Sequence, residues 1–319
     1  MTGSAGYIGS VLTRRLLEKG HNVRGLDSLL FGGESLLGVF GHPSFEFRRG
    51  DIRDRRDLLA AVENIDQVVH LAAIVGDPAC AKQPELATET NWSASQILFN
   101  LCLEQKHIER FVFASTCSNY GRMKDEQVVD ERSSLRPVSL YAELKVRFEK
   151  LILEGGVRRD FAPVSLRFAT VYGVSPRMRF DLTVNEFVRD VWAGKELQVY
   201  GEQFWRPYCH VRDLAEACLL ALECKFEKIR QNVYNVGDSR ENYQKKFLAE
   251  DIRRLVPTAL IRYVHKQEDP RDYKVNFNKI RKELNFRITR TVSEGIREVL
   301  RALQSGIFMD PYQAKYQNI

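Results

Sequence analysis

The sequence predicts an α/β protein built on a doubly wound parallel sheet. Through its first half, short apolar runs alternate with segments of helical periodicity, which is typical of strand–helix–strand units. In the first such helix, after Gly9, the residues Val11, Leu12, Leu16 and Leu17 share one face. Strands are expected at residues 22–27, 45–48, 67–73, 111–115 and 163–168, and further helices at 84–104 and 139–154.

Beyond about residue 172 the pattern becomes less regular and richer in basic and aromatic residues. We therefore divide the chain into a main domain, residues 1–172, and a smaller C-terminal lobe, residues 173–319, over the edge where the strands end. We allow for segments of this lobe that return to the main sheet.

Composition excludes several classes of protein. The 319 residues are 44% hydrophobic and 28% charged, as in ordinary globular proteins. The sequence has neither an apolar run of membrane-spanning length nor a signal-peptide pattern. Its six cysteines are scattered without C-x-x-C spacing, which favours reduced thiols, a cytoplasmic location and no metal site. The net charge of +6 suits small anionic ligands and does not call for nucleic acid or a membrane.

A glycine loop precedes the first helix, with glycines at Gly3, Gly6 and Gly9. This spacing allows a tight turn, close approach of a pyrophosphate and helix–sheet packing, and the helix N-terminus attracts phosphate. Asp27 ends the second strand 18 residues after Gly9, where a carboxylate accepts ribose hydroxyls and repels a 2′-phosphate. The pattern predicts a Rossmann-type domain that binds NAD rather than NADP. Asp51 and Ile52, after the third strand, are candidates to hold the adenine ring, or form a simple turn.

The start of the chain departs from this pattern, because only Met1 and Thr2 precede Gly3 where an apolar first strand belongs. We interpret the first strand as missing or truncated and expect the native protein to carry further residues upstream, from a misplaced start site.

Tyr141 and Lys145 lie four residues apart, on one face of a predicted helix. A phenol has a pKa near 10, and a neighbouring ammonium group favours its ionised form; a shift of about three units needs about 4 kcal/mol. A tuned Tyr141 can then accept a proton from a sugar hydroxyl while hydride leaves for a nicotinamide. The spacing of Tyr141 and Lys145 alone also fits an exposed helix face. Support for a catalytic pair comes from residues 114–121, at the end of the preceding strand.

With these motifs the chain resembles the extended short-chain dehydrogenases/reductases that act on nucleotide sugars, over nearly its whole length. The resemblance rests on the glycine loop, residues 70–73, Asn91, Thr116 with Tyr120-Gly121, Tyr141 with Lys145, and residues 167–173, 206–213 and 269–272.

The resemblance implies specific roles. Thr116 hydrogen-bonds the reacting hydroxyl, Tyr141 is the base, and Lys145 tunes it and holds the nicotinamide ribose. It also implies a homodimer formed by the helical segments 84–104 and 139–154. The implied NAD-binding residues are Gly3, Gly6, Tyr7, Ile8, Gly9, Asp27, Asp51, Ile52, Leu71, Ala72, Ala73, Asn91, Tyr141, Lys145 and Phe168.

Two departures from the family pattern limit which reactions and which mode of substrate binding we expect. The 4,6-dehydratases carry an Asp-Glu pair directly after the threonine, where this chain has Cys117 and Ser118. A serine without an activating partner is not a general base, and Cys117 fits a small buried residue better than an acid, which disfavours elimination. Thr170 stands where many members place an asparagine that contacts the substrate diphosphate.

Arginines in the C-terminal lobe suit a diphosphate, since guanidinium groups bind phosphate oxygens in pairs. The stretch Pro176–Arg179 and the region of Asn185 also resemble a subgroup that contains GDP-heptose 4-dehydrogenases. His210 is interpreted as structural. The predicted substrate-binding residues are Thr116, Cys117, Thr170, Arg179, Asn185, Arg206 and Arg271.

The leading prediction is an NAD-dependent nucleotide-sugar 4-epimerase that works through a transient 4-keto sugar. One alternative is a 4-dehydrogenase that releases the keto sugar. Another, of a different class, is a non-catalytic NAD sensor or nucleic-acid-binding relative, against which the intact Thr116, Tyr141 and Lys145 argue.

Overall fold

The computed structural model describes residues 1–122, 128–265 and 271–318. Asp269 and Pro270, part of one family segment, lie outside the described residues. The main sheet is parallel and runs in the order β2, β1, β3, β4, β6, β10, with Thr2 between β1 and β3. Its strands are β1 (Val23–Asp27), β2 (Phe45–Arg49), β3 (Gln67–His70), β4 (Arg110–Thr116), β6 (Ala162–Phe168) and β10 (Asn232–Val236).

Thr2 occupies the central place of this sheet. It forms parallel bridges to both Leu26 and His70, and its amide donates to the carbonyl of Val69 at 3.0 Å. The backbone then turns at Gly3 into the glycine loop. Both neighbouring strands are therefore paired through Thr2 at their carboxyl ends, beside the loop.

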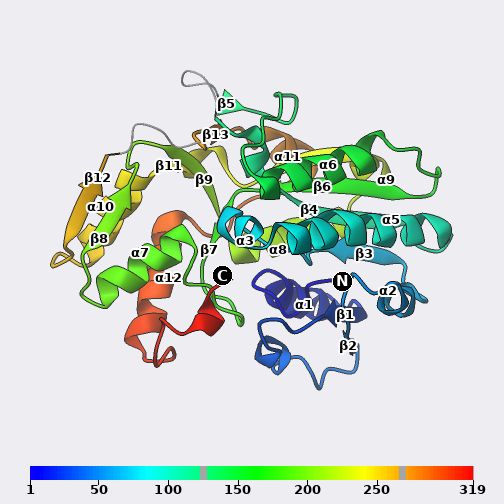
Figure 1. Cartoon of the computed structure of the whole chain (residues 1–319), viewed down its shortest axis with the longest axis horizontal. Coiled ribbons are helices and arrows are strands. Elements are labelled where there is room, and N and C mark those ends of the chain that lie inside the picture. Colours follow the sequence, from blue (N-terminus) through cyan, green and yellow to red (C-terminus); the bar gives the residue numbers. More distant parts are fainter. Residues whose placement is uncertain (123–127, 266–270, 319) are drawn as a thin grey trace.

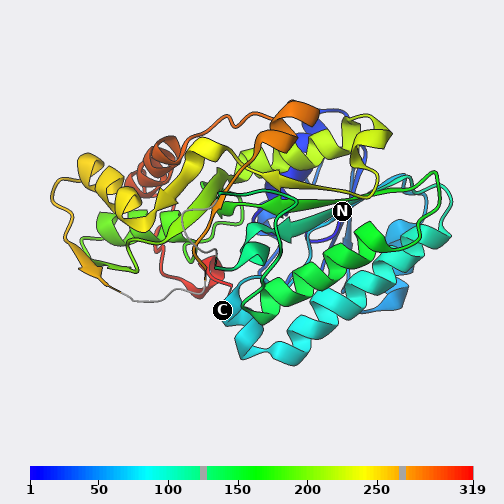
Figure 2. The same ribbon diagram turned by 90° about the horizontal axis from the view of Figure 1, so that it is seen from above.

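Helices cover both faces of the main sheet (Figure 2). One face carries α5 and α6, and the other carries α1 and α8. The α6 helix begins after Ser139, whose hydroxyl accepts the amide of Ala142, a typical N-cap. The helices around this sheet are α1 (Gly9–Glu18), α2 (Arg55–Val62), α3 (Asp77–Lys82), α4 (Pro84–Thr88), the π-helical turn η2 (Glu89–Ala94), α5 (Ser95–Glu104), α6 (Leu140–Glu154), α8 (Val211–Glu223), α9 (Phe226–Ile229) and α11 (Asn278–Glu283).

The remaining elements build a smaller half beside the carboxyl edge of the main sheet (Figure 1). Its core packs α7, α10 and α12 against β8 and β7. The elements of this half are β7 (Thr170–Tyr172), α7 (Thr183–Trp192), β8 (Leu197–Tyr200), β9 (Trp205–His210), β11 (Asn242–Gln244), α10 (Lys245–Leu255), β12 (Ile261–Val264) and α12 (Val292–Gln304), with the short turns η4 (Ser239–Glu241) and η5 (Ala314–Tyr316). Strands β5 (Val128–Val129) and β13 (Lys274–Val275) pair with each other. The short turns η1 (Glu34–Leu36) and η3 (Cys117–Tyr120) follow β1 and β4 of the main sheet.

The α/β class with a Rossmann-type sheet is thus confirmed. Strand β6 is buried along its whole length, as expected for a strand covered on both faces. The predicted helix at 84–104 is interrupted by the turn η2, and the predicted strand at 67–73 ends at His70. Among the described residues, no helix is long and apolar enough to span a membrane.

Candidate active site

A cavity of about 670 Å³ lies at the carboxyl ends of the main strands, where ligands bind in open α/β sheets. Its walls come from both halves of the molecule. Most of the predicted site residues line it: Gly3, Gly6, Tyr7, Ile8, Gly9, Asp27, Asp51, Ile52, Leu71, Ala72, Ala73, Thr116, Tyr141, Lys145, Phe168, Thr170, Arg179 and Arg271.

The glycine loop leaves no space for side chains at its first and last glycines. Gly3 has φ +73°, and a Cβ there would lie 2.8 Å from the amide nitrogen of Ala72. A Cβ on Gly9 would lie 1.9 Å from the carbonyl oxygen of Gly3. The loop therefore packs directly on the strand end and leads into α1, whose N-terminus faces the cavity and suits a pyrophosphate.

Asp27 lies at the end of β1 and is held in place by backbone amides. Its two carboxylate oxygens accept the amides of Ala5 and Leu29, each at 2.9 Å. Burial raises the pKa of this carboxyl group even though both amides favour its charged form. Further along the cavity, Asp51 pairs with Arg53 at 2.6 Å beside the buried Ile52. Since each carboxylate oxygen accepts more than one hydrogen bond, Asp27 retains capacity for ribose hydroxyls.

We predict that Asp27→Asn weakens NAD binding and improves NADP binding relative to NAD, because the negative charge that repels a 2′-phosphate is removed. The ratio of the two dissociation constants should change by about tenfold, which corresponds to the free energy of one hydrogen bond to a charged group. Calorimetric titration of both cofactors measures the ratio, and an unchanged ratio would show that Asp27 does not face the cofactor.

Thr116, Tyr141 and Lys145 meet at one end of the cavity. Thr116 ends β4, and its hydroxyl accepts the amide of Ser118 at 3.1 Å. The ammonium of Lys145 donates to the carbonyl of Ala114 at 2.7 Å and lies 5.9 Å from the centre of the Tyr141 ring. The turn of α6 that carries both residues faces the end of β4, so that a phenol, an ammonium and a hydroxyl border the same space.

Burial has the largest effect on the pKa values of Lys145 and Tyr141. It lowers the pKa of Lys145, which is only 4% exposed, to about 8. It also raises the pKa of the Tyr141 phenol, although the charge of Arg179 acts in the opposite direction. The net shift is upward, whereas the sequence argument expected Lys145 to lower it, because the desolvation of a phenolate outweighs the nearby cations.

Cys117 lies outside the cavity wall, whereas its neighbour Ser118 lines the cavity. Cys117 is 1% exposed, its thiol donates to the carbonyl of Arg167 at 3.2 Å, and burial raises its pKa. It is not among the residues that line the cavity, whereas Ser118 lines it next to Tyr273, whose hydroxyl lies 3.4 Å from that of Ser118. These two positions offer no carboxylate for an elimination.

Three further predicted residues lie outside the cavity wall. The side-chain amide of Asn91 pairs with both backbone groups of Ile74, at 2.8 and 2.9 Å, and so fixes a lining loop from behind. Arg206 donates to the carbonyl of Trp205 and lies 5.4 Å from the ring centre of Tyr273. Asn185 accepts the amide of Gly173 and donates to the hydroxyl of Tyr7, so it ties the glycine loop to the smaller half.

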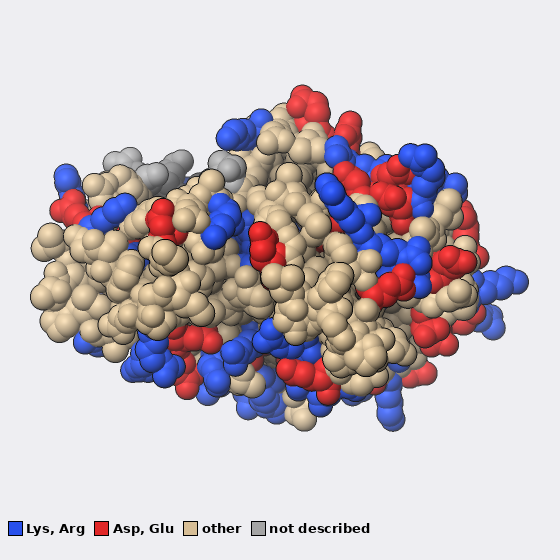
Figure 3. All heavy atoms as spheres, turned by 90° about the horizontal axis from the view of Figure 1, so that it is seen from below, with Lys and Arg blue, Asp and Glu red and all other residues tan. Residues whose placement is uncertain are grey.

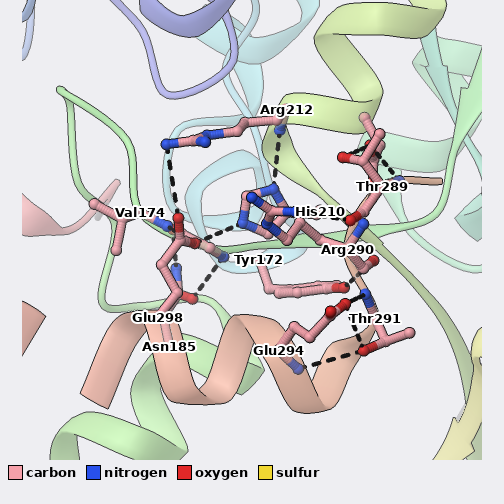
Figure 4. Close-up of polar contacts among 12 residues, drawn as sticks. Tyr172, Val174, Asn185, His210, Arg212, Thr289, Arg290, Thr291, Glu294 and Glu298 are labelled. Carbon is pink, nitrogen blue, oxygen red and sulfur yellow. Dashed lines mark hydrogen bonds and ion pairs between the residues drawn. The ribbon is translucent and has the colours of Figure 1, made fainter. Parts of the chain in front are cut away.

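The network around Asn185 continues to His210 (Figure 4). The imidazole of His210 accepts the amide of Arg212 and so caps α8, and it pairs with Glu298 of α12 at 2.7 Å. Glu298 also accepts the amide of Val174 at 3.2 Å. His210 thus serves structure, as expected, and the whole network fixes the backbone that leads from β7 into the cavity.

Charged side chains from the loop after β7 and from residue 271 also border the cavity. Arg179 forms a paired contact with Asp181, at 3.0 and 2.6 Å, and Arg271 pairs with Asp77 at 3.0 Å. Both arginines are thus held by carboxylates that also line the cavity. The sequence argument did not identify Asp77, Asp181 and Tyr273 as lining residues, because no motif or regular spacing marks them. Arg177, which belongs to the Pro176–Arg179 stretch noted in the sequence, also lines the cavity.

Known proteins share both sequence and fold with this chain. The model of the NAD dependent epimerase/dehydratase family matches residues 1–237. This chain belongs to that family. A UDP-glucose 4-epimerase from Lacticaseibacillus casei is 29% identical over 315 residues, which cover 88% of this chain and 92% of that protein.

Solved structures agree with this assignment. The UDP-glucose 4-epimerase of Thermus thermophilus in complex with NAD is 27% identical with a TM-score of 0.82, covering 95% of this chain and 97% of its own. DesIV, a dTDP-glucose 4,6-dehydratase from Streptomyces venezuelae with NAD and TYD bound, is 26% identical with a TM-score of 0.85 and covers 98% of both chains. The protein is therefore an NAD-dependent enzyme, and the predicted family and cofactor are confirmed.

Proposed function

We propose that this enzyme is a 4-epimerase of nucleoside-diphosphate sugars. The observation that carries the proposal is the composition of the cavity: Thr116, Tyr141 and Lys145 border it, while Cys117 and Ser118 replace the carboxylates of a dehydratase. Such a site can oxidise and reduce a sugar carbon, and it has no acid–base pair next to Thr116 to remove water.

In the proposed reaction, Tyr141 accepts the hydroxyl proton at C4 as the C4–H bond breaks and a carbonyl forms. Thr116 hydrogen-bonds the same oxygen and holds it against the phenol. The glycine loop would hold NAD, which would supply the acceptor and then the donor of this hydride. Tyr141 gives the proton back when hydride reaches the opposite face of C4, so each turnover balances without a second substrate.

The charge of the ligands supports this role of Tyr141. Burial opposes its ionisation, and Lys145 and Arg179 supply nearby positive charge. The nicotinamide ring of NAD⁺ adds a further positive charge when the cofactor is bound, which favours the phenolate in a cavity of low dielectric constant. The proposal therefore expects Tyr141 to become a base only in the complex with oxidised cofactor.

Arg179 and Arg271 are proposed to bind the substrate diphosphate, since guanidinium groups pair with phosphate oxygens. Thr170 borders the same region. Each arginine is paired with a carboxylate that orients it, Arg179 with Asp181 and Arg271 with Asp77. Homodimerisation through the helical segments 84–104 and 139–154 remains a proposal from the family resemblance, and a cytoplasmic location remains a proposal from the scattered cysteines.

A 4-dehydrogenase that releases the keto sugar is the second candidate, favoured by the resemblance of Pro176–Arg179 to the GDP-heptose 4-dehydrogenases. A nucleic-acid-binding role has less support. On the face shown in Figure 3, positive and negative side chains lie interspersed, whereas nucleic acid is bound by clustered cations.

Incubation with UDP-, GDP-, dTDP- and CDP-sugars, followed by NMR of the products, tests the proposal. The expected result is a C4 epimer of one sugar without a rise in NADH absorbance. Stoichiometric NADH together with a keto sugar would replace the epimerase by the dehydrogenase.

A further inference from the structure

Arg177 connects the smaller half of the molecule with the cofactor side of the cavity. It lies in the loop between β7 and α7, yet it lines the cavity together with Asp27 and Phe31. Its guanidinium carbon lies 4.3 Å from the centre of the Phe31 ring, and its charge favours the ionised form of Asp27. Phe31 follows Asp27 by four residues, so Arg177 stands at the end of the cavity where Asp27 is expected to meet the ribose.

The guanidinium of Arg177 is buried and only partly satisfied. The residue is 6% exposed, and one terminal nitrogen donates to the carbonyl of Gln317 at 3.0 Å. Within the described part of the chain, its Nε has no hydrogen-bond partner. A buried donor that borders a cavity and lacks a partner is costly unless a ligand supplies an acceptor.

Asp27 and Arg177 offer complementary groups to the same ligand atom. The carboxylate of Asp27 accepts hydrogen bonds, and the guanidinium of Arg177 only donates them. A ribose hydroxyl does both, so it can donate to Asp27 and accept from Arg177. The contact of Arg177 with Phe31 fixes the plane of the guanidinium and reduces the entropy lost on binding.

We propose that Arg177 binds the ribose of the adenosine half of NAD, opposite Asp27. The loop that carries it also carries Arg179, two residues further on, which lines the same cavity and is proposed above to bind the substrate diphosphate. One loop of the smaller half would thus contact cofactor and substrate, and the cation would partly offset the repulsion of a 2′-phosphate by Asp27.

Titration of the full-length protein, stripped of cofactor, with NAD, NADP, 5′-AMP and UDP tests this proposal by calorimetry. In Arg177→Gln, the affinity for NAD and 5′-AMP should fall about tenfold, as expected for one charged hydrogen bond. Affinity for NADP should fall further, because its 2′-phosphate loses a cation. The ratio of NADP to NAD dissociation constants should therefore rise, opposite to Asp27→Asn, and Arg177→Lys should restore part of the loss.

Arg189→Gln is the matched control. Arg189 is also buried, lies 4.4 Å from the centre of the Tyr312 ring and donates to a carbonyl, but it does not line the cavity. It should lower the melting temperature while the affinity for NAD stays unchanged. Wild-type affinity of Arg177→Gln for NAD and NADP, with or without weaker UDP binding, would overturn the proposal. So would equal losses of NAD affinity in both variants. Since no readout requires turnover, the outcome does not depend on the proposed epimerase reaction.

Discussion

Tyr141→Phe should lower kcat by about 10²–10⁴-fold, the usual contribution of a general base, while NAD still binds with nearly wild-type affinity. The ring remains in the cavity and only the hydroxyl is lost, so the cofactor side keeps its shape. Turnover of the nucleotide sugar gives kcat, and calorimetry gives the dissociation constant of NAD.

Tyr234→Phe is a suitable control for this variant. Tyr234 is buried, and its hydroxyl is hydrogen-bonded to Lys228 and Glu283, but it lies outside the cavity wall. It should lose stability and retain kcat. Wild-type turnover of Tyr141→Phe would remove Tyr141 from the proposed mechanism.

Glu149→Ala should lower the free energy of unfolding by about 3–5 kcal/mol, because it leaves a buried guanidinium without its counter-ion. Glu149 of α6 pairs with Arg167 of β6 at 2.5 Å, and their side chains are only 2% and 5% exposed. Glu149 also accepts the hydroxyl of Ser165 at 2.7 Å. The pair fixes the helix that carries Tyr141 and Lys145 to the sheet.

Denaturant titration measures this loss. The double variant Glu149→Leu/Arg167→Met should be less destabilised than Glu149→Ala, since two apolar groups need no counter-ion. If the single variant unfolds at the wild-type denaturant concentration, the buried pair does not contribute to stability as described.

The parts of this protein that could be predicted from sequence are those with a local pattern. The apolar run of β6 and the helix expected at residues 139–154 are read from neighbouring residues, and the glycine spacing at Gly3 and Gly9 follows from backbone sterics. Local patterns therefore predicted the class of fold, the glycine loop, Asp27 and the Tyr141–Lys145 pair, whereas most other residues of the cavity wall were named from the family resemblance.

Residues whose position depends on distant contacts could not be placed in this way. Asn185 and Arg206 were expected at the substrate, and the structure places them outside the cavity wall, where Asn185 contacts Tyr7 and Gly173. Arg177 is brought beside Asp27 only by the folding of the smaller half against the main sheet. Likewise β10 joins β6 in the main sheet although the two are far apart in sequence.

The most direct test of the proposed reaction follows a deuterium label at C4 of the accepted nucleotide sugar. An epimerase returns the same hydride, so the C4 epimer should carry deuterium at C4 in NMR, and NADH should not accumulate. Hydride held on a nicotinamide does not exchange with water, which makes retention of the label decisive. Transfer of the deuterium to accumulating reduced cofactor, with release of a 4-keto sugar, would contradict the account.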